Sequence, residues 1–232
     1  MRVGLLLCDH LREMLPSDVR SYDGLFYDLL AEQHGDLDMR VYDVEIGRLP
    51  ADLDECDRFI VTGSRAGAYQ SLPWLPRLEH WIRSAVAAGR PLVGVCFGHQ
   101  IIAQALGGTV TQSANGWGVG VRTVPVFSRG LAARLGKPSL SLVYSHQDQI
   151  AALPPGATPL AGDEFCRYAA YKIGGRVLGF QGHPEFTHPV GRYLLRYAYP
   201  GLSPTQRAAA WNSLQHPTDN RSVARMMLEY GA

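Results

Sequence analysis

Short apolar runs alternate with amphipathic segments through the first half of the chain. Residues 2–8 and 91–95 are apolar runs of the length that buried strands have. Between them, residues 75–88 carry apolar side chains at helical spacing and stop at Gly89, a residue favoured after the C-terminus of a helix. Strands that alternate with helices in this way predict βαβ units, and therefore a parallel sheet with helices on both faces.

The pattern changes after Gly107 and Gly108, where strand-like segments follow one another before the chain returns to helix near its end. The strands expected from the whole pattern are 2–8, 39–42, 58–61, 91–95, 109–112, 119–126, 140–143, 168–172 and 177–180, and the helices are 22–32, 75–88, 98–106, 190–198, 204–214 and 222–230. No repeat or low-complexity linker divides the chain. Residues 1–232 are therefore expected to form one α/β domain, with an open, mostly parallel sheet, flanking helices and additional antiparallel strands.

Composition and charge exclude several classes of partner. The chain carries 22 basic and 21 acidic residues, a net charge of +1, whereas binding to nucleic acid or to an anionic membrane surface calls for a basic patch. No segment has the length and apolarity of a membrane span or of a signal peptide. The four cysteines are widely spaced, without a CxxC pair, which favours free thiols in the cytoplasm.

The strongest chemical motif is Gly94-Val95-Cys96-Phe97-Gly98, which lies between a predicted strand and a predicted helix. It is the cysteine counterpart of the G-x-S-x-G nucleophile elbow, in which small residues let the chain turn sharply and expose the central side chain. The positive end of the following helix favours the thiolate form of Cys96. A buried cysteine that only fills space is the alternative, but the strand-turn-helix context favours a nucleophile.

A thiolate that cleaves an amide also needs a group to protonate the leaving amine. His183 and Glu185 follow the predicted strand 177–180 and are two residues apart, so in an extended segment they point to the same side. The carboxylate of Glu185 is then placed to orient the His183 imidazole, as in a catalytic triad. The order Cys, His, Glu differs from the Ser, Asp, His order of α/β-hydrolases. The sequence therefore predicts a Cys96–His183–Glu185 triad outside that family.

These motifs resemble the class I (triad) glutamine amidotransferase family, whose fold is flavodoxin-like. The resemblance rests on GVCFGHQ and GFQGHPEF, with support from TGSRAGAYQSLPW, IIAQALGG, NGWGVG and SHQDQIAALPPG. Together they are similar to the stand-alone branch that resembles GMP synthase and includes plant γ-glutamyl peptidases. The likeness runs from Arg2 to about Phe186 and is weak beyond that point, where residues 199–220 exceed what a minimal amidotransferase domain needs.

The resemblance implies roles for further residues. The N–H of Phe97, with one from the loop at Gly63 and Ser64, is expected to form the oxyanion hole. Many amidotransferases have a second Gly or a Pro where this chain has Ser64 and Arg65, which leaves open which residue of that loop is the donor. The residues that the resemblance places in the glutamine pocket are Gln100, Trp117, Gly118, Ser145 and His146. Asp148 is interpreted as a turn or capping residue instead of a catalytic acid.

The predicted activity is hydrolysis of the γ-glutamyl amide bond of glutamine or of a γ-glutamyl compound through a Cys96 thioester, without a metal or another cofactor. One biological role is a glutaminase subunit that feeds ammonia to a synthase on another chain. The other is a free-standing γ-glutamyl peptidase or amidase. A non-catalytic binding or regulatory module on the same fold is a third interpretation, since fold alone does not establish function; the presence of all three triad residues argues against it.

Overall fold

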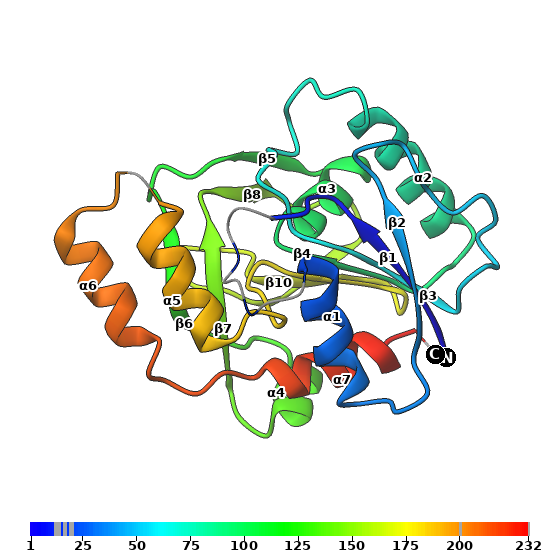
Figure 1. The fold of residues 1–232 in the computed structure, drawn as a ribbon. Coiled ribbons are helices and arrows are strands. Elements are labelled where there is room, and N and C mark those ends of the chain that lie inside the picture. The colour runs from blue at the N-terminus through cyan, green and yellow to red at the C-terminus, as the bar shows by residue number, and fades with distance from the viewer. Residues whose placement is uncertain (12–14, 16–17, 19–20, 200, 232) are drawn as a thin grey trace.

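A mixed sheet of seven strands forms the centre of the protein in the computed structural model, which describes residues 1–11, 15, 18, 21–199 and 201–231. The strands lie in the order β2-β1-β3-β4-β11-β10-β9; β2 to β11 run parallel, and β10 and β9 are antiparallel to their neighbours (Figure 1). Their bounds are β1 Arg2–Leu7, β2 Asp38–Asp43, β3 Arg58–Val61, β4 Leu92–Val95, β9 Ala157–Ala161, β10 Ala170–Ile173 and β11 Val177–Phe180. The predicted α/β class with a mostly parallel sheet is confirmed.

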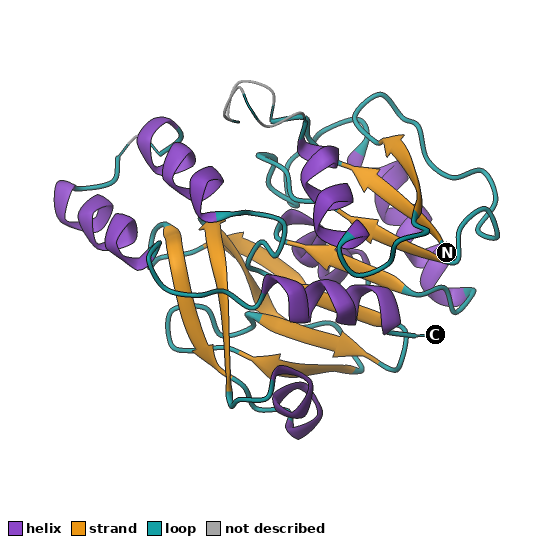
Figure 2. Cartoon of the chain, turned by 60° about the horizontal axis from the view of Figure 1, so that its bottom comes forward, coloured by secondary structure: helices purple, strands orange, loops and turns teal. Residues whose placement is uncertain are grey.

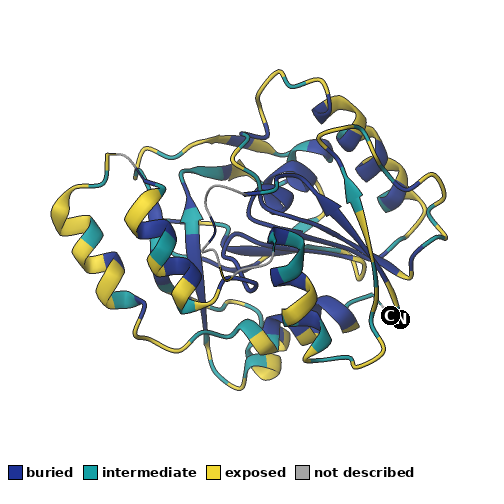
Figure 3. Ribbon diagram, viewed as in Figure 1, coloured by how far each residue is buried: buried dark blue, intermediate teal, exposed yellow. Residues whose placement is uncertain are grey.

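Helices cover both faces of this sheet because the inner strands are apolar on both sides. In β1, Val3, Leu5 and Leu7 pack with one core and Leu6 packs with the other, as the two-residue period of a strand requires. The first core contains α1 (Tyr22–Ala31) and α7 (Asn220–Glu229); the second contains α2 (Leu75–Ala87) and α3 (Phe97–Ala105). Figure 2 shows this layering, and Figure 3 shows that the inner strands are buried while the outer sides of the helices are exposed.

The second half of the chain adds antiparallel ribbons and helices beside the sheet. β6 (Gly118–Pro125) pairs with β7 (Ser139–His146), and β5 (Thr109–Gln112) pairs with β8 (Asp148–Ala152). α5 (His188–Tyr197) and α6 (Pro204–Ser213) lie at the β6–β7 end of the molecule (Figure 1). A β-bridge between Val143 and His183 joins the β6–β7 ribbon to the segment after β11. The ribbon therefore reaches the carboxyl edge of the parallel strands.

Three elements were not predicted from the sequence: β8, β9 and the short helix α4 (Arg129–Leu135). Asp148 is the first residue of β8, so its interpretation as a turn or capping residue is wrong. β8 buries Ile150 alone among its five residues, and β9 contains Pro159 at an edge of the sheet, so neither has the apolar alternation typical of a strand. None of the described helices combines the length and the apolar character needed to cross a membrane.

Candidate active site

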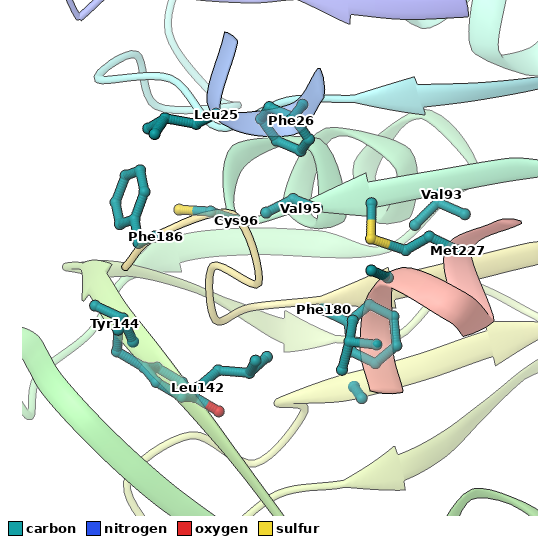
Figure 4. Packing of buried hydrophobic residues seen from close by; sticks show 14 of the residues in the cluster. Leu25, Phe26, Val93, Val95, Cys96, Leu142, Tyr144, Phe180, Phe186 and Met227 are labelled. Atoms are coloured by element: carbon teal, nitrogen blue, oxygen red, sulfur yellow. The ribbon is translucent and has the colours of Figure 1, made fainter. Parts of the chain in front are cut away.

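Cys96 occupies a sharp turn between β4 and α3, with φ 52° and ψ −105°. A non-glycine residue in this conformation is strained and is retained where the surroundings impose it. The Cys96 N–H donates to the Phe180 carbonyl at 2.8 Å, and the Gly98 N–H donates to the Thr62 carbonyl at 3.0 Å, so the ends of β3 and β11 hold the turn. Figure 4 shows Cys96 beside Val95, with its sulfur on the side of Phe186.

Glycine is required on both sides of the cysteine for steric reasons. A Cβ at Gly98 would lie 2.0 Å from the Val61 oxygen, and a Cβ at Gly94 would lie 2.5 Å from the Gly98 carbonyl carbon. Both distances are far below ordinary contact, and the clashing atoms are backbone atoms, which cannot rotate away. The two glycines of G-x-C-x-G are therefore needed because α3 packs so closely against β3 and β4.

His183 and Glu185 lie at the carboxyl end of β11, adjacent to Cys96. The His183 Nδ1 and Glu185 Oε1 atoms are 2.7 Å apart, and both side chains are buried. The Phe186 ring stacks on the imidazole at 4.1 Å with an interplanar angle of 1°, and the backbone N–H of His183 donates to the Val143 carbonyl at 2.8 Å. Strand β7 thus holds the backbone of His183 and Phe186 fixes the imidazole plane, while Nε2 makes no hydrogen bond to a described residue.

The charges around His183 favour its protonated form. Burial alone lowers the pKa of His183, but the carboxylate of Glu185 and the neighbouring Cys96 sulfur outweigh burial and raise that pKa well above its ordinary value. His146, also buried, behaves in the opposite way: burial lowers its pKa to about 3, so it is neutral at physiological pH. His183 and His146 thus carry different charges because His183 has the Glu185 carboxylate as its partner.

The remaining cysteines lack this environment. Burial raises the pKa of Cys8 and Cys56, and it raises the pKa of Cys166 to about 12. All four thiols are free and buried, but Cys96 lines a cavity and lies next to His183. Reactive cysteines are those in accessible, electropositive surroundings, so Cys96 is the candidate nucleophile among the four.

The loop after β3, residues 62–65, approaches Cys96 from the opposite side to β11, and we call it the oxyanion loop. The Gly63 N–H donates to the Tyr22 hydroxyl at 3.1 Å, so this N–H is already engaged. Within the described part of the chain, the N–H groups of Ser64 and Phe97 have no acceptor. Of the three residues predicted for the oxyanion hole, Ser64 and Phe97 are therefore the two with donors available.

The predicted substrate residues gather around a cavity of about 420 Å³ that opens beside Cys96. Such a volume falls within the roughly 300–1,000 Å³ of small-molecule sites. Gln100, Trp117, Ser145 and His146 all line this cavity. Gln100 Nε2 donates to the Asp148 carbonyl at 2.7 Å and to Gln181 Oε1 at 3.1 Å. These bonds fix the Gln100 amide at the cavity wall.

Gly118 belongs to the site in a different way. It does not line the cavity; instead, a Cβ at this position would lie 2.6 Å from His146 Nε2. The glycine on β6 therefore leaves room for the His146 ring on the neighbouring strand β7, and the two residues are paired in the ribbon register.

Several residues that line the cavity were not predicted from the sequence. Tyr22 and Phe186 lie beside Glu185 and His183, and Leu194 and Tyr199 come from the part of the chain beyond Phe186. The Tyr199 hydroxyl donates to Ser145 Oγ at 2.6 Å, and its ring packs on Trp117 with the centroids 5.1 Å apart. The stretch after α5 thus contributes to the cavity wall. No local motif marks these residues, because their contacts join distant parts of the chain.

No group of three or more His, Cys, Asp or Glu side chains suited to a metal ion occurs within residues 1–11, 15, 18, 21–199 and 201–231.

Comparison with known proteins agrees with this architecture. Residues 30–196 match the sequence profile described as glutamine amidotransferase class-I. The chain belongs to this family. It is 30% identical over 195 residues to γ-glutamyl peptidase 3 of Arabidopsis thaliana, an alignment that covers 80% of this chain and 76% of the relative. It is also 32% identical over 196 residues to one subunit of the glutamine-hydrolysing GMP synthase of Methanoculleus marisnigri, covering 82% and 98% of the two chains.

Solved structures of amidotransferases share the fold. A glutamine amidotransferase from Thermotoga maritima superposes with a TM-score of 0.76 and covers 98% of this chain and 94% of its own, at 20% sequence identity. The coverage includes most of the C-terminal segment. The amidotransferase family and its α/β fold, both predicted from sequence, are thus confirmed.

Proposed function

We propose that this amidotransferase hydrolyses γ-glutamyl amide bonds through a thioester on Cys96. The observation that carries the proposal is the convergence at one cavity of a strained cysteine, a histidine bonded to a buried carboxylate, and N–H groups that have no acceptor among the described residues. Each has a required role in amide cleavage by a cysteine nucleophile.

The first half of the reaction forms the thioester. The Cys96 thiolate attacks the δ-carbonyl carbon of the γ-glutamyl group, and the carbonyl oxygen becomes an oxyanion that accepts hydrogen bonds from the N–H groups of Ser64 and Phe97. As the C–N bond breaks, the His183 imidazolium donates its proton to the leaving nitrogen, which departs as ammonia or an amine. The raised pKa of His183 keeps that proton available at neutral pH.

The second half releases glutamate. Neutral His183 takes a proton from water, and the resulting hydroxide attacks the thioester carbonyl. The C–S bond breaks, the thiolate returns, and the imidazolium is restored. Glu185 holds Nδ1 throughout the reaction, so Nε2 faces the reacting atoms.

Two observations favour a leaving group larger than ammonia. The cavity wall includes apolar side chains that a glutamyl group alone does not account for, among them Leu11 and Leu194. The relative from Arabidopsis thaliana is named a γ-glutamyl peptidase. We therefore favour a free-standing γ-glutamyl peptidase or amidase.

A glutaminase subunit is the second candidate, because the relative in Methanoculleus marisnigri belongs to a GMP synthase as one of its subunits and aligns over 98% of its length. A protein of this kind delivers ammonia to a partner chain and is expected to be restrained when alone.

The deciding experiment assays the isolated protein for glutamate release from free glutamine, γ-glutamyl dipeptides and γ-glutamyl amines, with Cys96→Ser as the blank. We expect at least one γ-glutamyl amide to be cleaved faster than glutamine. If every γ-glutamyl compound is inert and glutamine turns over only after a second protein is added, the glutaminase-subunit function stands instead. Inactivity under all conditions would contradict both.

A further inference from the structure

Tyr22 is the first residue of α1 and lies in the interior of the protein, next to the candidate triad. Ser21 caps the helix by accepting the Gly24 N–H at 3.2 Å, which sets where α1 begins. The Tyr22 side chain is 1% exposed, and its ring packs against Phe26 and Phe186 at centroid distances of 5.5 and 6.1 Å. Packing on both sides therefore fixes the position of its hydroxyl.

That hydroxyl joins two parts of the site. It donates to Glu185 Oε1 at 3.0 Å and accepts the Gly63 N–H at 3.1 Å. Glu185 Oε1 is also the atom bonded to His183 Nδ1 at 2.7 Å. A continuous chain of hydrogen bonds thus runs from the backbone of the oxyanion loop, through Tyr22 and Glu185, to the imidazole.

The direction of the bond to Glu185 follows from electrostatics. Burial and the neighbouring Glu185 raise the pKa of Tyr22 well above its ordinary value, so the phenol keeps its proton and is the donor. In the described residues, Tyr22 and His183 supply the hydrogen bonds to the Glu185 carboxylate, and Oε2 has no partner. A buried carboxylate with few donors is destabilising, so each remaining donor matters for its placement.

The approach at Gly63 is too close for any other residue. A Cβ at Gly63 would lie 2.6 Å from the Tyr22 hydroxyl, 3.0 Å from His183 Cε1 and 3.6 Å from Cys96 Cβ. The oxyanion loop, the nucleophile and the base therefore meet at this residue, and Tyr22 contacts the loop there.

Three hydrogen bonds to Asp9 hold the other end of the loop. The Asp9 carboxylate accepts the Arg65 N–H at 2.9 Å and the Arg65 side chain at 2.8 and 2.9 Å. Ser64 lies between Gly63, which is bonded to Tyr22, and Arg65, which is bonded to Asp9. Its N–H, which has no acceptor in the described structure, is thus held in place from both sides.

We propose that Tyr22 is a positioning residue that couples the orientation of Glu185, and through it His183, to the position of the Ser64 N–H in the oxyanion loop. The Tyr22 hydroxyl is engaged by Glu185 and by the Gly63 N–H, so Tyr22 acts through these two groups. Tyr22 thereby acts on two groups that stabilise the transition state: the His183 imidazolium and the N–H that donates to the oxyanion. The inference rests on the proposed hydrolysis for its kinetic consequence, but the hydrogen-bond chain exists without substrate.

The kinetic test compares Tyr22→Phe with Tyr42→Phe. Tyr42 donates to Glu55 Oε2 at 2.8 Å, so the control loses the same kind of tyrosine–carboxylate bond far from the cavity. With the best γ-glutamyl substrate, Tyr22→Phe is expected to lower kcat by about 10- to 100-fold, less than the roughly 100- to 1,000-fold loss of an oxyanion-hole donor itself. KM should change little, because the lost interaction acts mainly in the transition state. Tyr42→Phe should match the parent protein.

A second measurement needs no substrate. Titration of His183, followed by NMR of the histidine ring and assigned with His183→Gln, is expected to shift by about one unit in Tyr22→Phe, because the lost hydrogen bond changes how the Glu185 carboxylate stabilises the imidazolium. The other titratable groups near His183 are Cys96 and His146; His146 is already neutral across this range. A tyrosine that only fills the core would leave the titration unchanged.

The outcomes separate this inference from the proposed function. A shifted His183 titration in a protein that cleaves no γ-glutamyl compound supports the hydrogen-bond chain and counts against the activity. An active enzyme whose kcat and His183 titration are both unchanged in Tyr22→Phe contradicts the role of Tyr22. A double-mutant cycle adds a third readout: in a Glu185→Gln background the kcat loss from Tyr22→Phe should shrink, and fully additive losses would show that Tyr22 does not act through Glu185.

Discussion

The two sides of the cavity are built in different ways. On the triad side, the ends of β3, β4 and β11 bring backbone atoms so close that Gly94 and Gly98 admit no Cβ. On the other side, the β6–β7 ribbon and the segment after α5 present side chains such as Trp117, Ser145 and Tyr199. In the proposed reaction, backbone geometry on the first side positions the reacting groups, and side chains on the second side determine how the substrate fits. Changes to the first side should therefore affect kcat and folding, and changes to the second should affect KM.

The largest effects are expected for the triad itself. Cys96→Ala and His183→Ala should each reduce turnover by about 10⁴-fold or more, since nucleophile and base act as a unit. Glu185→Ala should retain roughly ten to one hundred times more activity than either, because the orienting acid contributes less. Initial rates at saturating substrate measure all three. A fully active Glu185→Ala protein would show that another group orients His183, and Asp148, which also lines the cavity, is the first to test.

The next effect tests the steric requirement of the elbow. Gly98→Ala places a methyl group where the Val61 oxygen lies 2.0 Å away, so the free energy of unfolding should fall by about 1–3 kcal/mol or more, with loss of activity. Gly175→Ala is the matched control, because nothing lies within 4 Å of a Cβ there. Chemical denaturation measures both. Equal stability of the two variants would contradict the close packing of α3 on β3.

A smaller effect concerns pH. Because Glu185 raises the pKa of His183, the imidazolium persists above neutral pH and is lost only as the pH rises through that raised value. The alkaline limb of kcat/KM, which reports the free enzyme, should therefore lie above pH ~8 and move to lower pH in Glu185→Gln. Glu55→Gln, which changes a carboxylate bonded to Tyr42 outside the cavity, should leave the profile in place. An unmoved limb in Glu185→Gln would mean that another group controls it.

The smallest effect tests the side-chain wall. Tyr199→Phe removes the 2.6 Å bond to Ser145 but keeps the ring against Trp117, so KM is expected to rise about two- to tenfold, the range for one hydrogen bond of about 0.5–1.5 kcal/mol, with kcat nearly unchanged. Tyr197→Phe, at an exposed position of α5, is the control. Steady-state kinetics on one γ-glutamyl amide measures KM and kcat for both variants. A loss confined to kcat would place Tyr199 with the chemistry instead.

The features that the sequence could predict are those set by local geometry, and the features that it could not predict depend on contacts between distant segments. The G-x-C-x-G spacing and the pair His183 and Glu185 are local patterns, and local sterics and strand geometry were enough to place them together. Helices α2, α5 and α7 were predicted because each buries regularly spaced apolar residues, and the inner strands were predicted because they are short apolar runs.

The rest depends on contacts between distant segments. Tyr22 and Glu185 are 163 positions apart, and Tyr199 and Ser145 are 54 apart, so no pattern in the sequence marks either bond. The same applies to Gly63, whose N–H is engaged because a tyrosine from another element reaches it. The short helix α4 buries Leu131 alone, too little for an apolar stripe to reveal it.

The measurement that tests the central claim most directly is site-resolved labelling with a glutamine-mimicking electrophile, such as a diazoketone analogue of glutamine. Intact mass and peptide mapping report which thiol reacts and how fast. We expect a single adduct on Cys96, formed far faster than any on Cys8, Cys56 or Cys166 and suppressed in His183→Ala. Labelling spread evenly over the four cysteines, or unchanged in His183→Ala, would contradict a Cys96 nucleophile activated by its histidine.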